Sequence, residues 1–539
     1  MVECTMSKGK GDRIMIPTPQ QQIIYDILSG HRKLRSSESG NISVDAVAGS
    51  GKTTTAVQAA KYASKRYKRI AFTAFNKGIA EELGKKLQGS AESSTLHSLG
   101  MRLVKSKLPS LTVDSAGQKY RKIAQKEFPS YFESKGTRSF LKPQYASLFA
   151  ILNLIRSENF PIDALTQDIK SQISKSCDIQ GVALPSREYV DEVIGAAFRC
   201  LEIGSDWSVI SELDFPDMIW LPVKMDIASK DFDLLFADEA QDFNRVQQQL
   251  ILRVSENTVI VGDPYQSIMG WAGADSKSFR NLTNALHAKE LPLSVCWRCP
   301  TSHLELARKL VPHIEASPSA TEGVWDTIDS YTIAGRVAPG DLIICRNNAP
   351  LISVAYNLMR QKIPCMVKGK DIGADIINLI EKLDPFDMKD LNSRLSRWKE
   401  REQKKLLDRD AHESAFDALE DKVQTILELS SECDTVSEMT KLCEDLFKEK
   451  SDGEKIQLSS IHRAKGLEAE TVVLLRPDLC CARAKDPEAY QQEKNLLYVG
   501  LTRAKRNLFV AGGVGGCGPD FPDWIEDVAR RNMPRPKFV

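Results

Sequence analysis

The sequence predicts an α/β protein with two parallel-sheet units, each interrupted by a helical insertion. Short runs of β-branched and apolar residues fall into two groups, one within 42–75 and 233–263 and the other within 341–368 and 455–512. Helical patterns fill the stretch between the two parts of each group, at about 94–228 and 371–454. Strands that alternate with helices in this way favour parallel sheets.

The first strand leads into a glycine turn with the pattern of a phosphate-binding loop. The stretch SVDAVAGSGKTTTAV, at 43–57, passes from apolar residues through two glycines into a helix. Gly49 and Gly51 allow backbone N–H groups to converge on a β-phosphate, while Lys52 reaches the β- and γ-phosphates. The alternative, an ordinary Gly/Ser turn, is disfavoured by the strand and helix on either side. We therefore predict that the chain uses ATP and Mg²⁺, with a cradle made of Ala48, Gly49, Ser50, Gly51, Lys52, Thr53 and Thr54.

Two acids follow a second predicted strand. The segment DFDLLFADEAQD, at 231–242, is apolar until it reaches Asp238 and Glu239, which places both at the carboxyl edge of the sheet. Asp238, together with Thr53, is predicted to hold Mg²⁺, and Glu239 to orient or deprotonate the attacking water. The alternative, two solvated acids that cap the next helix, loses weight because the phosphate loop is also present.

Length and composition restrict the class of protein. A chain of 539 residues is longer than the roughly 250–300 residues of a single core, so we expect several domains. The content of 42% hydrophobic and 27% charged residues is typical of a soluble globular protein, and no apolar run reaches the ~20 residues of a membrane span. The first residues lack the apolar core of a signal peptide. A net charge of +1 leaves nucleic-acid binding to local patches.

The cysteines indicate a reducing compartment. The twelve cysteines show no repeating disulfide or zinc spacing. Cys296 and Cys299 have the C-x-x-C spacing, but no second pair lies nearby. We favour buried free thiols over a structural metal site.

Ten short motifs follow one another along the chain. They are TPQQQ (18–22), AGSGKTT (48–54), FTAFNK (72–77), TLHS (95–98), DEAQD (238–242), VGDPYQSIMGWAGA (261–274), WRCP (297–300), IICRNNA (343–349), SSIHRAKGLE (459–468) and LLYVGLTRAK (496–505). With these motifs the chain resembles superfamily 1 helicases of the UvrD/Rep type over most of its length. The resemblance implies two RecA-like P-loop NTPase-type domains.

The resemblance also implies domain boundaries. The first RecA-like domain is expected at 1–93 and 229–288, with a helical insertion at 94–228. The second is expected at 289–370 and 455–515, with a reduced helical insertion at 371–454, and a C-terminal helix and tail occupy 516–539.

Further residues are assigned to the nucleotide. Thr18 and Pro19 form a helix start, and the amide of Gln21 one turn later could both donate and accept. By resemblance Gln21 reads the adenine, with Gln20 or Gln22 as alternatives in another register. The remaining roles implied by resemblance are γ-phosphate sensing by Gln266, arginine fingers at Arg298 and Arg503, adenine stacking by Trp297 and ribose contact by Glu468.

A single strand of nucleic acid is held by stacking on aromatic rings and by backbone contacts, and each stacked base is worth about 1–3 kcal/mol. The residues that the resemblance assigns to this track are Phe75, Asn76, Thr95, His97, Trp271, Arg346, His462 and Lys465. For each one alone, a packed structural residue is the competing interpretation. The chain also departs from the family pattern at Thr54, Met269 and Ala272, and its second insertion is shorter.

The resemblance implies an ATP-dependent DNA helicase that moves 3′ to 5′ on single-stranded DNA and unwinds duplexes. The alternative is an ATP-gated remodeller that displaces a protein or filament, or recruits a partner, without processive unwinding. Expected partners are single-stranded DNA and single-strand/duplex junctions, with RNA as an alternative track, and a repair or replication protein; no membrane is expected. The expected location is the cytoplasm of a bacterial or phage-infected cell, or a nucleus, and intracellular in either case.

Overall fold

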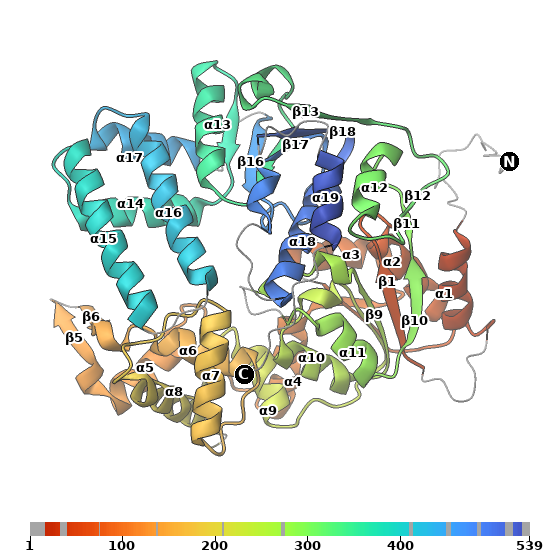
Figure 1. Cartoon of the computed structure of the whole chain (residues 1–539). Helices are drawn as coiled ribbons and strands as arrows, with labels where there is room; N and C mark the ends of the chain where they lie inside the picture. Colours follow the sequence, from red (N-terminus) through yellow and green to blue (C-terminus); the bar gives the residue numbers. More distant parts are fainter. Residues whose placement is uncertain are drawn as a thin grey trace.

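Two six-stranded parallel sheets form the frame of the molecule in the part of the chain that the structure describes (Figure 1). The computed structural model describes residues 17–32, 40–74, 76–135, 138–206, 208, 210–270, 275–408, 413–448, 454–481, 487–512 and 521–530. None of the helices within these ranges is both long and apolar enough to cross a membrane.

The first sheet has the strand order β10-β1-β9-β8-β2-β3. Its strands are β1 (Ile42–Ala46), β2 (Ile70–Ala74), β3 (Glu92–Thr95), β8 (Phe232–Ala237), β9 (Ser255–Gly262) and β10 (Lys289–Leu293). One face packs against α1 (Pro19–Ser29), α2 (Lys52–Ala63) and α3 (Lys77–Leu87). The other face packs against α10 (Arg245–Val254) and α11 (Ser278–Ala285). Because both faces are covered, central strands such as β2 are buried at every residue.

The second sheet has the order β13-β18-β17-β14-β16-β15. Its strands are β13 (Val324–Ile328), β14 (Leu342–Cys345), β15 (Cys365–Val367), β16 (Ile456–Ser460), β17 (Ala469–Leu475) and β18 (Ala504–Ala511). Its helices are α12 (Thr301–Arg308), α13 (Ala349–Arg360), α18 (Pro487–Leu501) and α19 (Phe521–Arg530). A short parallel pair, β11 (Val295–Cys296) with β12 (Glu315–Ala316), lies between the two sheets in the chain.

Each sheet is interrupted by helices. Between β3 and β8 lie α4 (Leu96–Lys107), α5 (Lys119–Glu127), α6 (Leu148–Ser157), α7 (Gln167–Ile179), α8 (Val190–Gly204) and α9 (Asp217–Lys224), with the pairs β4 (Thr112–Val113)–β7 (Glu212–Leu213) and β5 (Phe132–Lys135)–β6 (Arg138–Leu141). Between β15 and β16 lie α14 (Lys370–Leu383), α15 (Met388–Asp408), α16 (Glu413–Ser431) and α17 (Val436–Leu446).

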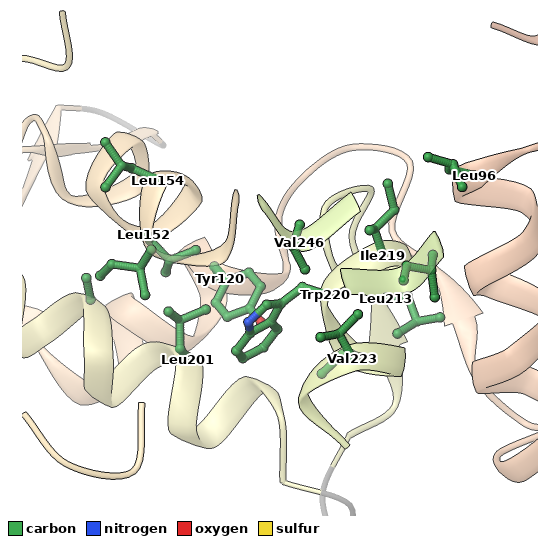
Figure 2. Packing of buried hydrophobic residues seen from close by; sticks show 14 of the residues in the cluster. Leu96, Tyr120, Leu152, Leu154, Leu201, Leu213, Ile219, Trp220, Val223 and Val246 are labelled. Carbon is green, nitrogen blue, oxygen red and sulfur yellow. The ribbon is translucent and has the colours of Figure 1, made fainter. Parts of the chain in front are cut away.

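A buried charge network fixes the first insertion. Figure 2 shows Tyr120 and Trp220 beside each other in its core. Arg156, 1% exposed, lies over the Tyr120 ring and donates to Asp214 and Asp217, each at 2.7 Å. Asp217 also accepts from the phenol of Tyr120 at 2.8 Å and from a buried lysine of α5 at 2.5 Å. Because each buried charge has an opposite partner, the network fixes the segment 214–217 in one position.

The predicted fold class is confirmed: two parallel sheets, each interrupted by helices. The edge strands β3, β10 and β13 were not anticipated. Strand β10 pairs with β1 in the first sheet, although it lies in the stretch from 289 that the sequence assigned to the second domain. The other domain boundaries stay predictions.

Candidate active site

The phosphate loop lies at the carboxyl end of β1. Gly49 and Gly51 have φ values of 67° and 76°, in the left-handed region that glycine adopts without strain. A Cβ on Gly49 would lie 2.8 Å from Sγ of Cys296 and 2.7 Å from Cβ of Arg298. The backbone N–H of Trp297 also donates to the Gly49 carbonyl at 2.8 Å. Glycine is therefore required here by both the turn and the close approach of the 296–298 segment.

A cavity of about 630 Å³ opens over this loop. We call residues 17–293 the first sheet unit and residues 295–530 the second. The cavity wall combines residues of both units. Those of the first unit are Gly49, Ser50, Gly51, Lys52, Thr53, Thr54, Asn76, Ile79, Glu239, Asp242, Asn244, Gln247, Gln266 and Met269, and they face Arg298, Lys465, Gly466 and Arg503. The volume and polarity suit a nucleotide.

Thr53, which lines this cavity, is hydrogen-bonded to Asp238 behind it. The hydroxyl of Thr53 donates to Oδ2 of Asp238 at 2.9 Å. Burial and the neighbouring Glu239 raise the pKa of Asp238 to about 6, while the bond from Thr53 opposes that rise. Among the described residues no cluster of three or more His, Cys, Asp or Glu side chains could hold a metal by itself. A hydroxyl and a carboxylate in contact fit a Mg²⁺ that takes its other oxygens from phosphate and water.

Burial would raise the pKa of Glu239, but the ammonium groups of Lys52 and Lys465 outweigh it and hold the pKa below its ordinary value. Its carboxylate accepts from the Gln241 amide at 2.5 Å. Glu239 is therefore ionised at neutral pH next to a carboxyl with a raised pKa, which is an arrangement suited to a base that orients water.

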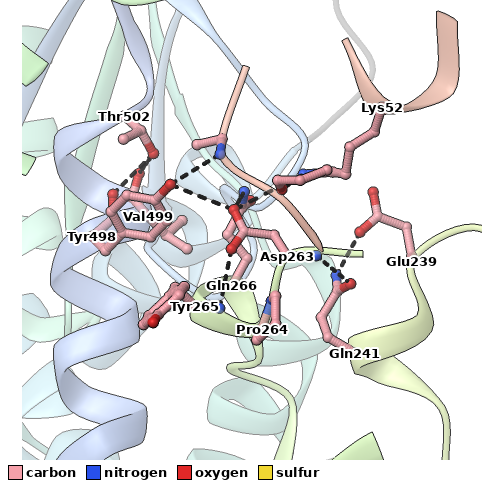
Figure 3. Close-up of polar contacts among 12 residues, drawn as sticks. Lys52, Glu239, Gln241, Asp263, Pro264, Tyr265, Gln266, Tyr498, Val499 and Thr502 are labelled. Atoms are coloured by element: carbon pink, nitrogen blue, oxygen red, sulfur yellow. Dashed lines mark hydrogen bonds and ion pairs between the residues drawn. The ribbon is translucent and has the colours of Figure 1, made fainter. Parts of the chain in front are cut away.

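Lys52 lies against the loop that follows β9. Its Nζ is 4.0 Å from Oδ2 of Asp263 and donates to the Ala46 carbonyl at 3.4 Å. Gln266, at the end of the same loop, donates to Asp263 at 2.6 Å. Figure 3 shows Lys52, Asp263 and Gln266 converging on one point between the two sheet units.

The two predicted arginine fingers come from the second unit. Arg298 donates from Nε to Glu468 at 2.6 Å and from Nη1 to the Thr502 carbonyl at 3.3 Å. Arg503, 1% exposed, donates from Nη2 to Oε1 of Gln266 at 3.3 Å. Burial and the positive charge of Arg298 lower the pKa of Arg503 to about 10, so the guanidinium stays charged at neutral pH. Both arginines thus place positive charge on the side of the cavity that the second unit forms, whereas Lys52 lies on the side that the first unit forms.

Lys465 lies in the same cavity. Its Nζ is 2.5 and 2.7 Å from the two oxygens of Asp242 and donates to the Gln266 carbonyl at 2.8 Å. The ion pair is buried and joins the second unit to the first. Lys465 thus lines the cavity, and its contact with nucleic acid stays a prediction.

Two family models match the chain. The UvrD/REP helicase N-terminal domain matches residues 30–287, and the UvrD-like helicase C-terminal domain matches residues 378–512. Together these matches cover more than half of the sequence. The chain belongs to the UvrD/Rep helicase family.

Three curated proteins illustrate the similarity. F-box DNA helicase protein 1 of Schizosaccharomyces pombe is 27% identical over 514 residues, which is 87% of this chain and 55% of that protein. F-box DNA helicase 1 of Gallus gallus is 24% identical over 324 residues, covering 52% of this chain and 29% of that protein. ATP-dependent DNA helicase Rep of Buchnera aphidicola is 29% identical over 204 residues, covering 35% of this chain and 26% of that protein. The chain therefore spans about half or less of these relatives.

The residues assigned to the base and ribose lie outside the cavity wall. Gln21, 9% exposed, donates to the Thr55 hydroxyl at 2.9 Å and accepts from the backbone of Thr18 at 2.9 Å, so its amide completes a capping box. The neighbouring glutamines pair elsewhere, Gln20 with Ser294 and Gln22 with Asp26. Trp297 is 48% exposed, beside the phosphate loop. The adenine role of Gln21 stays a prediction.

The residues assigned to nucleic acid are dispersed. Phe75 and Trp271 lie outside the described residues. Asn76 and Thr95 cap helices, accepting from Ile79 N and Ser98 N, and Asn76 also lines the cavity. Arg346 pairs with Glu493 at 2.9 Å, and burial together with the Arg346 charge lowers the pKa of His462. Their contact with nucleic acid stays a prediction.

His97 has a neighbour that the motifs did not include. The ring of Phe215 lies 4.3 Å from the His97 ring, centroid to centroid, and Phe215 is 62% exposed. Phe215 stands between Asp214 and Asp217, the two acids of the buried network, so an exposed ring is held by buried charges on both sides. The only sequence signal was an aromatic between two acids, and the link to His97 requires the fold.

Proposed function

We propose that the chain is an ATP-dependent motor that moves 3′ to 5′ on single-stranded DNA and unwinds duplex DNA ahead of it. The observation that carries the proposal is the cavity of about 630 Å³ in which the phosphate loop and acids of one sheet unit face two arginines of the other. A nucleotide held there would contact both units. Its binding and hydrolysis would therefore change their relative position. The 3′ to 5′ direction rests on the family resemblance.

The roles of the side chains follow from their positions. Lys52 would exchange Asp263 for the β- and γ-phosphates, and Thr53 and Asp238 would hold Mg²⁺, which supplies positive charge to the phosphate oxygens when bound. Glu239 would orient the attacking water. Arg503 would stabilise the charge that develops on the transferred phosphoryl group.

For the DNA track, the exposed ring of Phe215 beside His97 offers a platform on which a base can stack. The first sheet unit and its insertion supply both rings. Arg346, 26% exposed in its side chain, is a candidate phosphate contact from the second unit. A strand bound to residues of both units would be moved when the cavity closes and opens.

The test pairs ATP hydrolysis with strand displacement. We expect wild-type turnover to rise when oligodeoxythymidylate is added, and Lys52→Ala and Glu239→Gln to abolish turnover. Lys61→Ala, on the same helix α2, is the matched control and should behave as wild type. If no single strand raises turnover, the motor proposal is wrong.

A strand-displacement assay determines the direction of movement and distinguishes a helicase from a remodeller. A duplex with a 3′ tail should be unwound, and one with a 5′ tail should not. DNA-stimulated hydrolysis without displacement of either duplex would favour the ATP-gated remodeller instead. Stimulation by oligouridylate alone would replace DNA with RNA as the track.

A further inference from the structure

Helix α18 of the second sheet unit contacts the first unit through one polar face. Asn495 donates from Nδ2 to the carbonyls of Ser267 at 2.9 Å and Pro264 at 3.4 Å. Tyr498 lies three residues later, so it projects from the same face of the helix. Both side chains are buried, at 5% and 1% exposure. They hold the loop 263–267, which carries Gln266 and belongs to the first unit.

Among the described residues, the hydroxyl of Tyr498 has two hydrogen-bond partners, both in the first unit. It accepts from the backbone N–H of Ala48, in the phosphate loop, at 2.9 Å. It lies 3.5 Å from Oδ2 of Asp263, at the outer limit of a hydrogen bond. Because an N–H can only donate and a carboxylate accepts, the phenol proton is directed at Asp263. Figure 3 shows this phenol pointing from α18 toward Asp263.

Asp263 connects this contact to the catalytic groups. The same oxygen, Oδ2, is 4.0 Å from Nζ of Lys52 and accepts from Gln266 at 2.6 Å. Asp263 is fully buried, so the direction of its carboxylate depends on these partners. Burial and the carboxylate of Asp263 raise the pKa of Tyr498 well above its ordinary value, so the phenol keeps the proton that it donates.

We infer that Tyr498 is a positioning residue for ATP hydrolysis: from the second sheet unit, its hydroxyl fixes the phosphate loop at Ala48 and orients Asp263, and thereby places Lys52. The inference rests on the proposed ATP hydrolysis. It assigns the coupling between the units to a neutral hydroxyl as well as to the arginines. It predicts an effect on turnover rather than on nucleotide binding, because Tyr498 does not line the cavity.

The test is Tyr498→Phe, which keeps the buried ring and removes the hydroxyl. We expect kcat to fall about tenfold, the change that corresponds to one hydrogen bond of ordinary strength, with the KM for Mg·ATP within about twofold. Tyr490→Phe is the matched control, because Tyr490 is buried on the same helix and donates to the Val528 carbonyl at 3.0 Å, away from the cavity. It should keep wild-type kcat.

Two further measurements separate positioning from a general loss of folded protein. Titration with a fluorescent ADP analogue should give the same stoichiometry for Tyr498→Phe as for wild type. In a cycle with Asp263→Asn, the two substitutions should be non-additive, so that Tyr498→Phe lowers kcat by less than about threefold in that background.

Several results would overturn the inference. The first is an equal kcat for Tyr498→Phe and Tyr490→Phe, and the second is a change in KM without a change in kcat. The third is a lower stoichiometry of ADP-analogue binding that accounts for the whole fall in kcat. The fourth is full additivity of the effects of Tyr498→Phe and Asp263→Asn on kcat. If wild-type turnover does not respond to DNA, the proposed function fails, whereas basal kcat still decides the inference. A chain without any ATP turnover overturns both.

Discussion

The ion pair between Lys465 and Asp242 joins the two sheet units inside the cavity, and Lys465→Met tests what it contributes. The ammonium lies 2.5 and 2.7 Å from the carboxylate oxygens, and the side chains are 12% and 8% exposed. Removing one partner of a buried pair while the other stays charged costs about 3–5 kcal/mol. Each kcal/mol corresponds to about 2–4 °C in Tm for a unit of 150–250 residues. At pH 8 we expect the Tm to fall by at least about 6 °C.

The loss depends on pH, because Asp242 can take up a proton once its partner is gone. Burial raises the pKa of Asp242 to about 6, and the ammonium of Lys465 opposes that rise. Without Lys465 the folded-state pKa is higher still, whereas the unfolded-state pKa stays near about 3.9. A carboxyl group with a raised folded-state pKa lowers stability progressively as pH rises from the unfolded-state pKa to the folded-state pKa, and the loss is complete above the latter. In wild type this loss is complete near pH 6, whereas in Lys465→Met it continues above pH 6. The difference in Tm should therefore be small at pH 5 and grow above pH 6.

Scanning fluorimetry of wild type and variants between pH 5 and 8 measures this difference. Lys277→Met is the control, because Lys277 and Glu488 also join the two units but are 66% and 52% exposed, and such a pair contributes about 0–1 kcal/mol. Adding Asp242→Asn to Lys465→Met removes the unpaired charge and should restore more than half of the lost Tm. A loss that is the same at pH 5 and pH 8, or no larger than that of Lys277→Met, would refute the reasoning.

Two other substitutions test the remaining surfaces. Phe215→Ala should weaken binding of a fluorescent oligodeoxythymidylate by about 5- to 150-fold at fixed salt, measured by anisotropy, because one stacked base contributes about 1–3 kcal/mol. Phe386→Ala is the control, because it removes an 80% exposed ring elsewhere and should leave the affinity unchanged. Equal effects of the two substitutions would contradict the proposal that Phe215 stacks on a base. Gly49→Ala should raise the Kd of a fluorescent ATP analogue at least about tenfold, because its Cβ would lie 2.8 Å from Cys296 Sγ at a positive φ. An unchanged Kd would contradict the proposal that the phosphate loop binds the nucleotide.

The fold class and the residues that follow the carboxyl ends of the strands could be predicted from the sequence, because strand-turn-helix patterns are local. Gly49, Lys52 and Asp238 each follow directly from a buried strand, and the carboxyl ends of parallel strands meet at one edge. The edge strand β3 was missed because its residues, ESST, are all polar, and β13, VWDTI, was missed because it is a short run of mixed residues.

What the sequence could not supply depends on contacts between distant segments. The ring pair of His97 and Phe215 joins residues separated by the four helices α5 to α8, and the contact of Tyr498 with Ala48 joins opposite halves of the chain. Lys465 was assigned to the track from its motif alone. Its ion pair inside the cavity depends on how the two units meet, which no local pattern records.

We propose above all that a nucleotide binds between the two sheet units, with its phosphates on the phosphate loop of the first unit and their charge neutralised by arginines of the second. Steady-state ATP hydrolysis by Arg503→Ala with saturating oligodeoxythymidylate tests it most directly. We expect kcat to fall by roughly 10³-fold while the KM for ATP changes little, because Arg503 acts on the transition state. Wild-type kcat in a folded Arg503→Ala variant would contradict it.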